Sequence, residues 1–327
     1  MTVTGADAPP TSALANPRAA RVKAVRRLTR RAGRERARRF LAEGPQAVRE
    51  AIVAHAELNR PVVHDLFVTT AAADRHTEIL AQAAEAGLEP VMVSDQVLGA
   101  MTETVTPQGM LAVCAAIDRP LAAVLDGLAP TLVAVLAQVR DPGNAGTVLR
   151  TADAAGADAV ILSDASVDVH NAKCVRATAG SIFHLPVVQG VPLEQVVAAL
   201  RARGLAVLAA DGDGDVDLDD LLDEADRRAL AGGQAVGDDP SASPALLSRP
   251  TAWLFGNEAW GLADEHRGLA DAVVRVPIHG RAESLNLATA ATVCLYASAR
   301  AQRARPVVPG PVAPRPTSGA ISTPQGR

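Results

Sequence analysis

Three short segments place polar side chains and glycine directly after apolar runs, and they are where this sequence offers chemistry. The first, DPGNAGTVLR, carries Asn144 and Arg150. The second, FGNEAWGL, carries Glu258, and the third, PIHGRAESLNL, carries Ser284 and Asn286. Glycine lets a ligand approach the backbone, while amide, carboxylate, hydroxyl and guanidinium groups can hold a polar substrate. The pattern indicates a site built from three loops, although each segment taken alone is also explained by an ordinary turn.

Other chemistries fit these segments less well. The first segment matches neither the phosphate-cradling GxxxxGK pattern nor the dinucleotide pattern GxGxxG. The chain has only two lysines, Lys23 and Lys173, which disfavours kinases and nucleotide hydrolases. Four scattered histidines form no arrangement with serine and acid and are expected to be structural or on the surface: His170, His184, His266 and His279.

Apolar runs alternate with helical patterns along most of the chain, which predicts an α/β fold. A small α/β domain is expected to end near Ile117. A second series begins with the strand at residues 131–139, which is apolar on both faces, and continues with a helix at residues 147–155, capped by Asn144, so that Arg150 points back to the same end of the sheet. This series predicts a mainly parallel sheet with helices on both faces. Its closing Ala-rich helix, residues 285–302, packs in the core or against another subunit.

Composition divides the chain further. We expect a disordered tail at residues 1–17, a basic segment with the small domain at 18–117, a linker at 118–130, the large domain at 131–303 and a disordered Pro-rich tail at 304–327. The three cysteines form no CxxC pair, the first residues lack the pattern of a signal peptide, and no apolar run is long enough to span a membrane. These features predict a cytoplasmic protein without membrane contact.

Charge is segregated although the net charge is only -4. The segment from Arg18 to Arg39 contains eleven basic residues and only one acidic residue, Glu35. This local excess of positive charge predicts a contact with nucleic acid. Acids dominate residues 211–239 instead, and we interpret about 211–245 as a surface insertion. Its DGDGDVDLDD run resembles a calcium loop but lacks the glutamate at the twelfth position. No metal is therefore expected.

In their order, the segments resemble the three motifs of the SpoU (TrmH-like) family of RNA ribose 2′-O-methyltransferases in the SPOUT superfamily. The resemblance covers about residues 132–301 and includes DPGNAGTVLRTADAAGADAVIL, VRATAGSIFHLPV, LFGNEAWGL and VPIHGRAESLNLATAA. RRAGRERARRFLAEGPQAVREAI resembles, more weakly, the start of the substrate-binding domain that many members carry. Two departures are LNLATAA, where many members read LNVSVAA, and Trp260, at a position that is usually small or polar.

The resemblance implies a site and a cofactor. It makes Arg150 the catalytic candidate, assisted by Asn144, Glu258, Ser284 and Asn286. It implies S-adenosylmethionine as cofactor, contacted largely through backbone by Gly256, Val276, Ile278 and Leu285. The substrate is then RNA, held through phosphates by arginines of the basic segment: Arg26, Arg27, Arg30, Arg31 and Arg34.

The family also implies a deep trefoil knot at the carboxyl end, which periodicity could not predict and which the general rule against threaded chains would have excluded. Members usually act as dimers with the active site completed across the interface, so a homodimer through the C-terminal domain is expected. The appended N-terminal domain favours ribosomal RNA, of the large subunit, over tRNA. A tRNA methyltransferase, or a ribosome-associated RNA-binding protein without turnover, are the alternatives.

Overall fold

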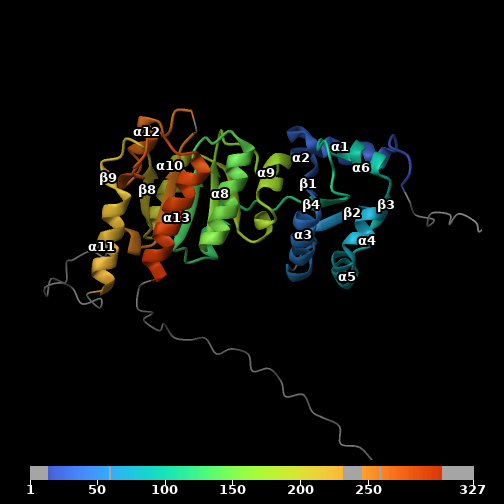
Figure 1. The fold of residues 1–327 in the computed structure, drawn as a ribbon, viewed down its shortest axis with the longest axis horizontal. Helices are drawn as coiled ribbons and strands as arrows, with labels where there is room; N and C mark the ends of the chain where they lie inside the picture. Colours follow the sequence, from blue (N-terminus) through green and yellow to red (C-terminus); the bar gives the residue numbers. More distant parts are fainter. Residues whose placement is uncertain (1–13, 59, 231–244, 258, 304–327) are drawn as a thin grey trace, which may run out of the picture.

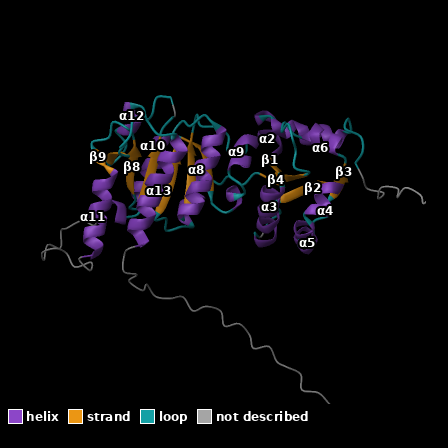
Figure 2. Ribbon diagram, viewed as in Figure 1, coloured by secondary structure: helices purple, strands orange, loops and turns teal. Residues whose placement is uncertain are grey.

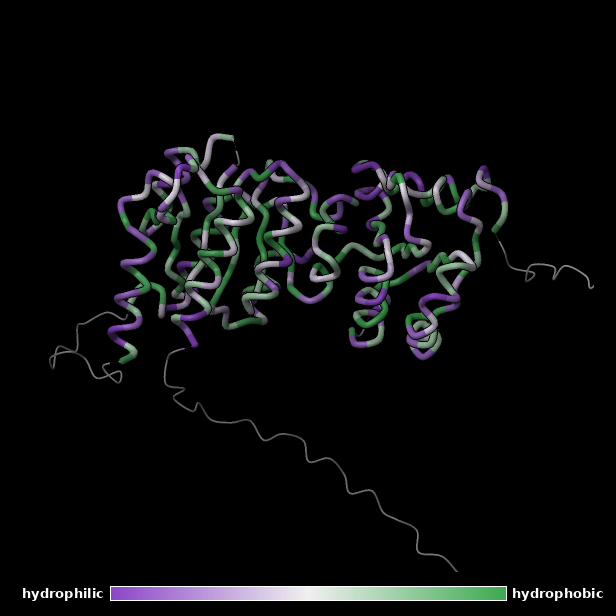
Figure 3. Tube along the Cα trace, in the orientation of Figure 1, coloured by the Kyte–Doolittle hydropathy of each residue, from purple (hydrophilic) through white to green (hydrophobic). Residues whose placement is uncertain are grey.

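Two sheets covered by helices make up the described part of the chain. The computed structural model describes residues 14–58, 60–230, 245–257 and 259–303. A four-stranded sheet is followed in the sequence by a seven-stranded sheet, and helix α9 (Ala172–Ala177) lies between the two (Figure 1). Helices flank each sheet (Figure 2). In Figure 3 the strands of the larger sheet are mainly hydrophobic, as burial on both faces requires.

The four-stranded sheet has the order β1-β4-β2-β3. Its strands are β1 (Arg39–Glu43), β2 (Val63–Thr69), β3 (Val91–Val93) and β4 (Met110–Ala115). Strand β4 is antiparallel to β1 and β2, whereas β2 and β3 are parallel. The helices of this part are α1 (Ala20–Arg26), α2 (Arg31–Ala37), α3 (Pro45–Glu57), α4 (Thr70–Arg75), α5 (Thr77–Glu85) and α6 (Asp95–Met101), with a short 3-10 turn η1 (Arg27–Thr29).

Alternation along β1 distributes its side chains between two cores. Phe40 packs into the cluster that holds α3 and α5, and Leu41 packs into the cluster of α1 and α6. The basic segment takes part in this packing, because Val22 and Leu28 are buried in the second cluster. Leu14, assigned by sequence to the N-terminal tail, donates its backbone amide to the carbonyl of Met92 at 3.0 Å. The basic segment is therefore an integral layer of the small domain.

The seven-stranded sheet has the order β7-β6-β5-β10-β8-β11-β9, and every paired register is parallel. Its strands are β5 (Leu132–Leu136), β6 (Ala159–Ser163), β7 (Val187–Val191), β8 (Ala206–Ala210), β9 (Val216–Asp217), β10 (Thr251–Phe255) and β11 (Ala272–Arg275). Every residue of β5, β6 and β10 is buried, which confirms the predicted parallel sheet covered on both faces.

Helices cover both faces of this sheet. They are α7 (Leu121–Asp126), α8 (Pro142–Ala155), α9, α10 (Leu193–Ala202), α11 (Leu218–Leu230), α12 (Asp264–Arg267) and α13 (Leu287–Arg303), with 3-10 turns η2 (Ser181–Phe183) and η3 (Leu246–Ser248). Helices α8 and α13 share a core with one face of β5, and α7 and α10 share a core with the other. Most alanines of α13 are buried there, so core packing accounts for them: Ala288, Ala291, Ala297, Ala299 and Ala301.

The acidic stretch differs from the surface insertion expected from its charge. Its first part forms the edge strand β9, paired with β11, and the helix α11. Leu218, Leu221 and Ala225 of α11 are buried against the rest of the domain. Like charges occupy only one face of this amphipathic helix, and its apolar stripe closes the end of the core. Residues 231–244 lie outside the described residues, as do 1–13 and 304–327 of the two expected tails.

Three further features concern the described residues alone. No helix among them is both long and apolar enough to cross a membrane. No group of three or more His, Cys, Asp or Glu side chains is placed there to hold a metal ion. All three cysteines are buried and free, and burial raises the pKa of Cys174 and of Cys294 to about 12, so these thiols stay protonated at neutral pH.

Candidate active site at the carboxyl edge of the sheet

The carboxyl ends of parallel strands meet at one edge of a sheet, and here that edge gathers the segments singled out in the sequence. The loop after β5 leads into α8, the loop after β10 runs from residue 256 to α12, and the loop after β11 contains residues 276–286. Strand β10 lies directly beside β5, so the first two loops are neighbours. The topology therefore brings these segments together.

Helix α8 begins earlier than the sequence predicted, and the prediction that Asn144 caps it is wrong. Asp141 is the cap, because its Oδ1 accepts the backbone amide of Asn144 at 2.8 Å. Pro142 occupies the first helical position, where its fixed φ suits a helix and its missing N–H costs nothing. The other carboxylate oxygen of Asp141 accepts from Lys173 Nζ at 2.6 Å, and this lysine and the Asn144 amide lower the pKa of Asp141.

Asn144 and Asn286 meet as the first and third segments predict. Asn286 Nδ2 donates to Asn144 Oδ1 at 3.2 Å, while Asn286 Oδ1 accepts the amide of Ala288 at 2.9 Å and so caps α13. One amide side chain therefore ties the start of α13 to the first turn of α8. Ser284 lies exposed on the same loop. Glu258, the acid of the second segment, lies outside the described residues.

Arg150 is separated from this pair. Because α8 starts at Pro142, Arg150 lies more than two turns into the helix, about 9 Å along the axis from Asn144, rather than pointing back to the same end of the sheet. Its side chain is exposed and makes no hydrogen bond or ion pair to any described residue. It shares the outer stripe of α8 with Thr147 and Ala154. Within one chain, then, the structure does not bring Arg150 to Asn144.

Glycine in the loop after β10 serves backbone packing. A Cβ added to the buried Gly256 would lie 2.4 Å from the carbonyl carbon of Gly261, so only glycine allows the loop to fold back on itself. Asn257 holds the neighbouring loop, because its Nδ2 donates to the carbonyl of Gln138 at 3.0 Å. Gln138 has a φ of +54°, a strained conformation for a residue with a side chain. The sequence marked Asn257 only as an amide beside Gly256, and the structure shows that this amide is a positioning group for the neighbouring loop.

The loop after β11 is suited to an adenosine-containing cofactor. Ile278 and Leu285 are apolar and more than a third exposed, and Val276 is half-buried. Among the described residues, the backbone groups of 276–285 make no hydrogen bond, so their amides and carbonyls are available to a ligand. Half-exposed apolar side chains beside such groups can cover a purine ring while the backbone binds its polar edge.

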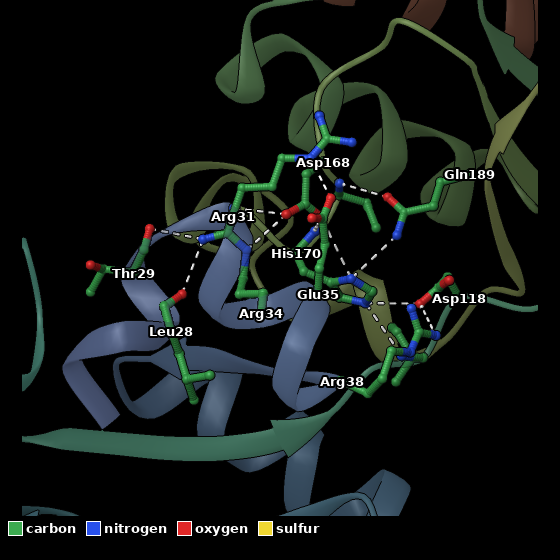
Figure 4. A network of polar contacts seen from close by, with 12 residues as sticks. Leu28, Thr29, Arg31, Arg34, Glu35, Arg38, Asp118, Asp168, His170 and Gln189 are labelled. Atoms are coloured by element: carbon green, nitrogen blue, oxygen red, sulfur yellow. Dashed lines mark hydrogen bonds and ion pairs between the residues drawn. The ribbon is translucent and has the colours of Figure 1, made fainter. Parts of the chain in front are cut away.

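The basic segment divides into exposed and buried arginines. Arg26, Arg27, Arg30 and Arg31 are exposed, as RNA contacts require. Arg34 is only 5% exposed and is unavailable to RNA, so its prediction as an RNA contact is wrong. Its Nε donates to Oδ2 of Asp168 at 2.8 Å, its Nη2 forms an ion pair with the same oxygen at 2.7 Å, and its Nη1 donates to two backbone carbonyls of the small domain (Figure 4). This guanidinium joins the two domains.

His170 lies beside this ion pair at the domain junction (Figure 4). Its ring packs on Phe40 at 4.7 Å between centroids, and its Nε2 accepts the amide of Ile117 at 3.3 Å. Burial lowers the pKa of His170 to about 4, although the nearby carboxylates of Asp118 and Asp168 oppose this shift. The ring is therefore neutral at pH 7 and acts as a hydrogen-bond acceptor between the domains.

A cavity of about 340 Å³ opens at the same junction. Its charged lining is balanced, since four arginines are matched by four acids: Arg31, Arg34, Arg38 and Arg39 against Glu35, Asp118, Asp164 and Asp168. Arg38 pairs with Asp118 at 2.9 Å and Arg31 with Glu35 at 2.7 Å. Such a lining favours a polar joint between domains over a phosphate site.

Comparison with known proteins identifies the family of this chain. The profile of the SpoU rRNA Methylase family matches residues 131–296, and that of the MRM3-like substrate binding domain matches residues 19–112. The two-domain α/β fold with a loop-built site at the carboxyl edge is thus that of a methyltransferase joined to a substrate-binding module. The chain belongs to the SpoU rRNA methylase family.

Relatives and solved structures agree with this assignment. The chain is 33% identical to the 23S rRNA (guanosine(2553)-2′-O)-methyltransferase RlmP of Bacillus subtilis, over 84% of this chain and 94% of that protein. It is similar to the AdoMet-bound rRNA methyltransferase of Sinorhizobium meliloti, with a TM-score of 0.66 and 30% identity over 86% of this chain and 94% of that one. It is also similar to the SpoU methyltransferase AviRb of Streptomyces viridochromogenes in complex with AdoMet, with a TM-score of 0.67 and 29% identity over 87% and 99%.

Proposed function

We propose that this protein transfers a methyl group from S-adenosylmethionine to a ribose 2′-hydroxyl of large-subunit ribosomal RNA. The observation that carries the proposal is the meeting of Asn144 and Asn286 at the carboxyl edge of the sheet, beside a loop with available backbone groups. Relatives that span nearly the same length bear the names of 23S rRNA 2′-O-methyltransferases. Action on ribosomal RNA also accords with a cytoplasmic location.

The cofactor fits the residues at this edge. The methyl group on its sulfonium is already activated for transfer, so no metal is needed. Val276, Ile278 and Leu285 would cover the adenine, and backbone groups of the same loop would bind its polar edge. Gly256 would contact the cofactor through its backbone, and it also keeps its own loop closed, because a Cβ there would meet the backbone of Gly261. The family's trefoil knot, threaded through these loops, remains a prediction.

The chain's own residues then have to align the hydroxyl and assist loss of its proton. A guanidinium stays protonated in proteins, so Arg150 acts electrostatically, by binding the target phosphate and stabilising charge that develops on the 2′-oxygen. The proton passes to the RNA phosphate or to a neighbouring carboxylate. Asn144, Ser284, Asn286 and Glu258 hold the ribose and the geometry of the loops.

RNA affinity should depend on the exposed arginines of the basic segment. Replacing Arg26, Arg27 and Arg30 with alanine removes phosphate contacts without touching the buried Val22 and Leu28, so RNA affinity should fall about 10- to 100-fold and the salt dependence of binding should lessen by about two units of log K per log salt. Cofactor affinity should not change. Fluorescence anisotropy with labelled RNA at several salt concentrations measures both quantities.

The control for this triple variant removes three arginines of the large domain, the exposed Arg201 and Arg300 and the half-buried Arg267, each engaged in an ion pair there. If both triple variants weaken RNA binding equally, the basic segment has no special role and the loss reflects net charge alone.

A homodimer through the C-terminal domain would bring Arg150 to the site of the partner subunit. Val293 and Tyr296 of α13 are exposed, 39% and 47%, although they are large and apolar or aromatic. The Tyr296 hydroxyl donates to the carbonyl of Ala154 on α8, so Tyr296 lies over the outer stripe that also carries Arg150. We therefore place the dimer contact on this face. Arg150 and Asn144, which are separate within one chain, would then come together across the contact between two subunits.

The dimer is tested by a charge on this face. Val293→Glu should halve the mass measured by light scattering and abolish methyl transfer, because two carboxylates would be buried in the interface. An unchanged mass would mean that this face is not the contact. The same substitution should leave the thermal midpoint nearly unchanged, which separates dissociation from unfolding.

Methyl transfer itself tests the proposed function. The full chain and labelled S-adenosylmethionine are incubated separately with large-subunit ribosomal RNA, with ribosomal particles and with tRNA, and the labelled ribose is mapped. Label in ribosomal RNA at a 2′-oxygen supports the proposal. Label in tRNA alone would identify a tRNA enzyme, and bound cofactor without label in either RNA or in ribosomal particles would identify a binder without turnover.

A further inference from the structure

Trp260 stands exposed at the edge of the site without a structural task. The chain has two tryptophans. Trp253 is fully buried and donates its indole N–H to Ser298 at 2.9 Å, whereas Trp260 is 51% exposed. Trp260 belongs to none of the hydrophobic clusters formed by the described residues. Tryptophan is enriched where proteins contact other molecules, so an indole exposed to this extent is suited to contact a ligand.

The loop that carries Trp260 is held by backbone rather than by its side chain. Asn257 and Gly261 exchange two backbone hydrogen bonds of 2.9 Å, and Gly261 has a φ of +66° that favours glycine. The amide of Asn257 ties this loop to Gln138. Trp260 is thus presented on a loop closed by backbone hydrogen bonds, directly beside the loop that enters α8.

The indole is backed by a cation. The guanidinium carbon of Arg140 lies 5.0 Å from the centroid of the Trp260 ring. Arg140 is exposed, makes no other interaction with a described residue, and immediately precedes Asp141, the cap of the helix that carries Asn144. A guanidinium stacked on indole fixes the ring plane and draws on its π-electrons. The pair comes from the ends of two adjacent strands, β5 and β10.

We propose that Trp260, braced by Arg140, stacks on the nucleobase of the nucleotide that is methylated. The inference rests on the proposed function and adds the group that holds the base. The 2′-hydroxyl reaction does not involve the base, so an enzyme must fix the nucleotide by other contacts before it can align the ribose. An aromatic face does this for any base, and RNA whose bases are unstacked is commonly bound in this way.

The residues around Trp260 favour a nucleotide over other ligands. The chain has only seven aromatic residues, and Trp260 is the one that combines high exposure, a cationic brace and a position at the carboxyl edge of the sheet. The neighbouring Arg140 carries a positive charge that suits the phosphate attached to a stacked nucleotide. An apolar peptide would gain nothing from that charge.

The test compares two RNAs that differ only in the base of the methylated nucleotide. The methylated nucleotide is first mapped with the wild-type enzyme. A matched RNA is then made that lacks the base at that nucleotide but keeps the ribose and its 2′-hydroxyl. The enzymes are wild type, Trp260→Ala, Trp260→Phe and, as a control at another exposed apolar residue, Leu58→Ala in the small domain. Single-turnover kcat/KM, cofactor affinity and mass by light scattering are measured for each.

With base-bearing RNA, Trp260→Ala should lower kcat/KM about 10- to 100-fold, and Trp260→Phe should retain most of it. With abasic RNA, wild type should fall to the level of Trp260→Ala, and the substitution should then have no further effect. The inference would be overturned if Trp260→Ala lowered kcat/KM equally on both RNAs, with or without a change of mass. Trp260 would then be a structural residue or a contact between subunits. If wild type methylates no RNA, the proposed function fails instead.

Discussion

Arg150→Ala is expected to lower methyl transfer about 10²- to 10³-fold while changing the affinity for S-adenosylmethionine less than twofold. Arg150 is exposed on α8, about 9 Å along the helix axis from Asn144, which bonds to Asn286 of the loop that is proposed to hold the cofactor. Its guanidinium can therefore act on the RNA and on the charge that develops during transfer, but not on cofactor binding. Single-turnover transfer gives the first quantity and calorimetric titration gives the second.

Two controls make this result interpretable. Arg201→Ala removes an arginine that pairs with Asp271 at the amino end of β11, at the edge of the sheet opposite the three loops, and it should leave transfer unchanged. Arg150→Lys keeps the charge but loses the planar fork, so it should recover only part of the rate. Loss of cofactor binding in Arg150→Ala would show that its assigned role is wrong.

Because Arg150 and Asn144 are separate within one chain, Arg150→Ala can also test whether the active site is shared between two subunits. If Arg150 acts on the partner's site, an equimolar mixture of inactive Arg150→Ala and inactive Asn144→Ala chains forms mixed dimers with one intact site, and about a quarter of wild-type activity returns after subunit exchange. A mixture that stays inactive although mixed dimers form would mean that Arg150 and Asn144 act within one chain.

The sequence predicted the first strand of the large sheet, because a run that is apolar on both faces is typical of a strand buried on both faces. The run at residues 131–139 contains β5, every residue of which is buried. The meeting of Asn144 with Asn286 also followed, since the carboxyl ends of parallel strands share an edge. The start of α8 did not follow, because Asp141 and Asn144 are both good caps and only the structure shows which one accepts the amide.

The roles of individual arginines could not be predicted, because a run of like charge does not reveal which side chain a second domain will cover. Arg34 lies eight residues after Arg26 and four after Arg30, and all three read as the same basic surface. Its partner Asp168 is 134 residues away. Burial of Arg34 depends on how α9 and its preceding loop pack on β1, which is a property of the assembled domains.

The Arg34–Asp168 pair should be the main electrostatic support of the domain junction. Arg34→Ala removes a guanidinium that makes four hydrogen bonds or ion contacts and leaves the Asp168 carboxylate, 11% exposed, without its cation. Breaking such a buried pair costs about 3–5 kcal/mol, a large share of the stability of an ordinary domain. Denaturant unfolding followed by circular dichroism should show this loss, whereas Arg31→Ala, which removes an exposed partner of Glu35, should change stability by less than about 0.5 kcal/mol.

The cost arises from the orphaned carboxylate, so removal of both partners should be milder. Arg34→Met combined with Asp168→Leu replaces the pair by apolar side chains of similar volume and should recover much of the stability that Arg34→Ala loses. If this double variant folds stably but transfers methyl more slowly at saturating RNA, the ion pair fixes the orientation of the substrate-binding domain against the site. Equal stability of Arg34→Ala and Arg31→Ala would instead mean that the junction is held by the packing of Phe40, His170 and Phe183 alone.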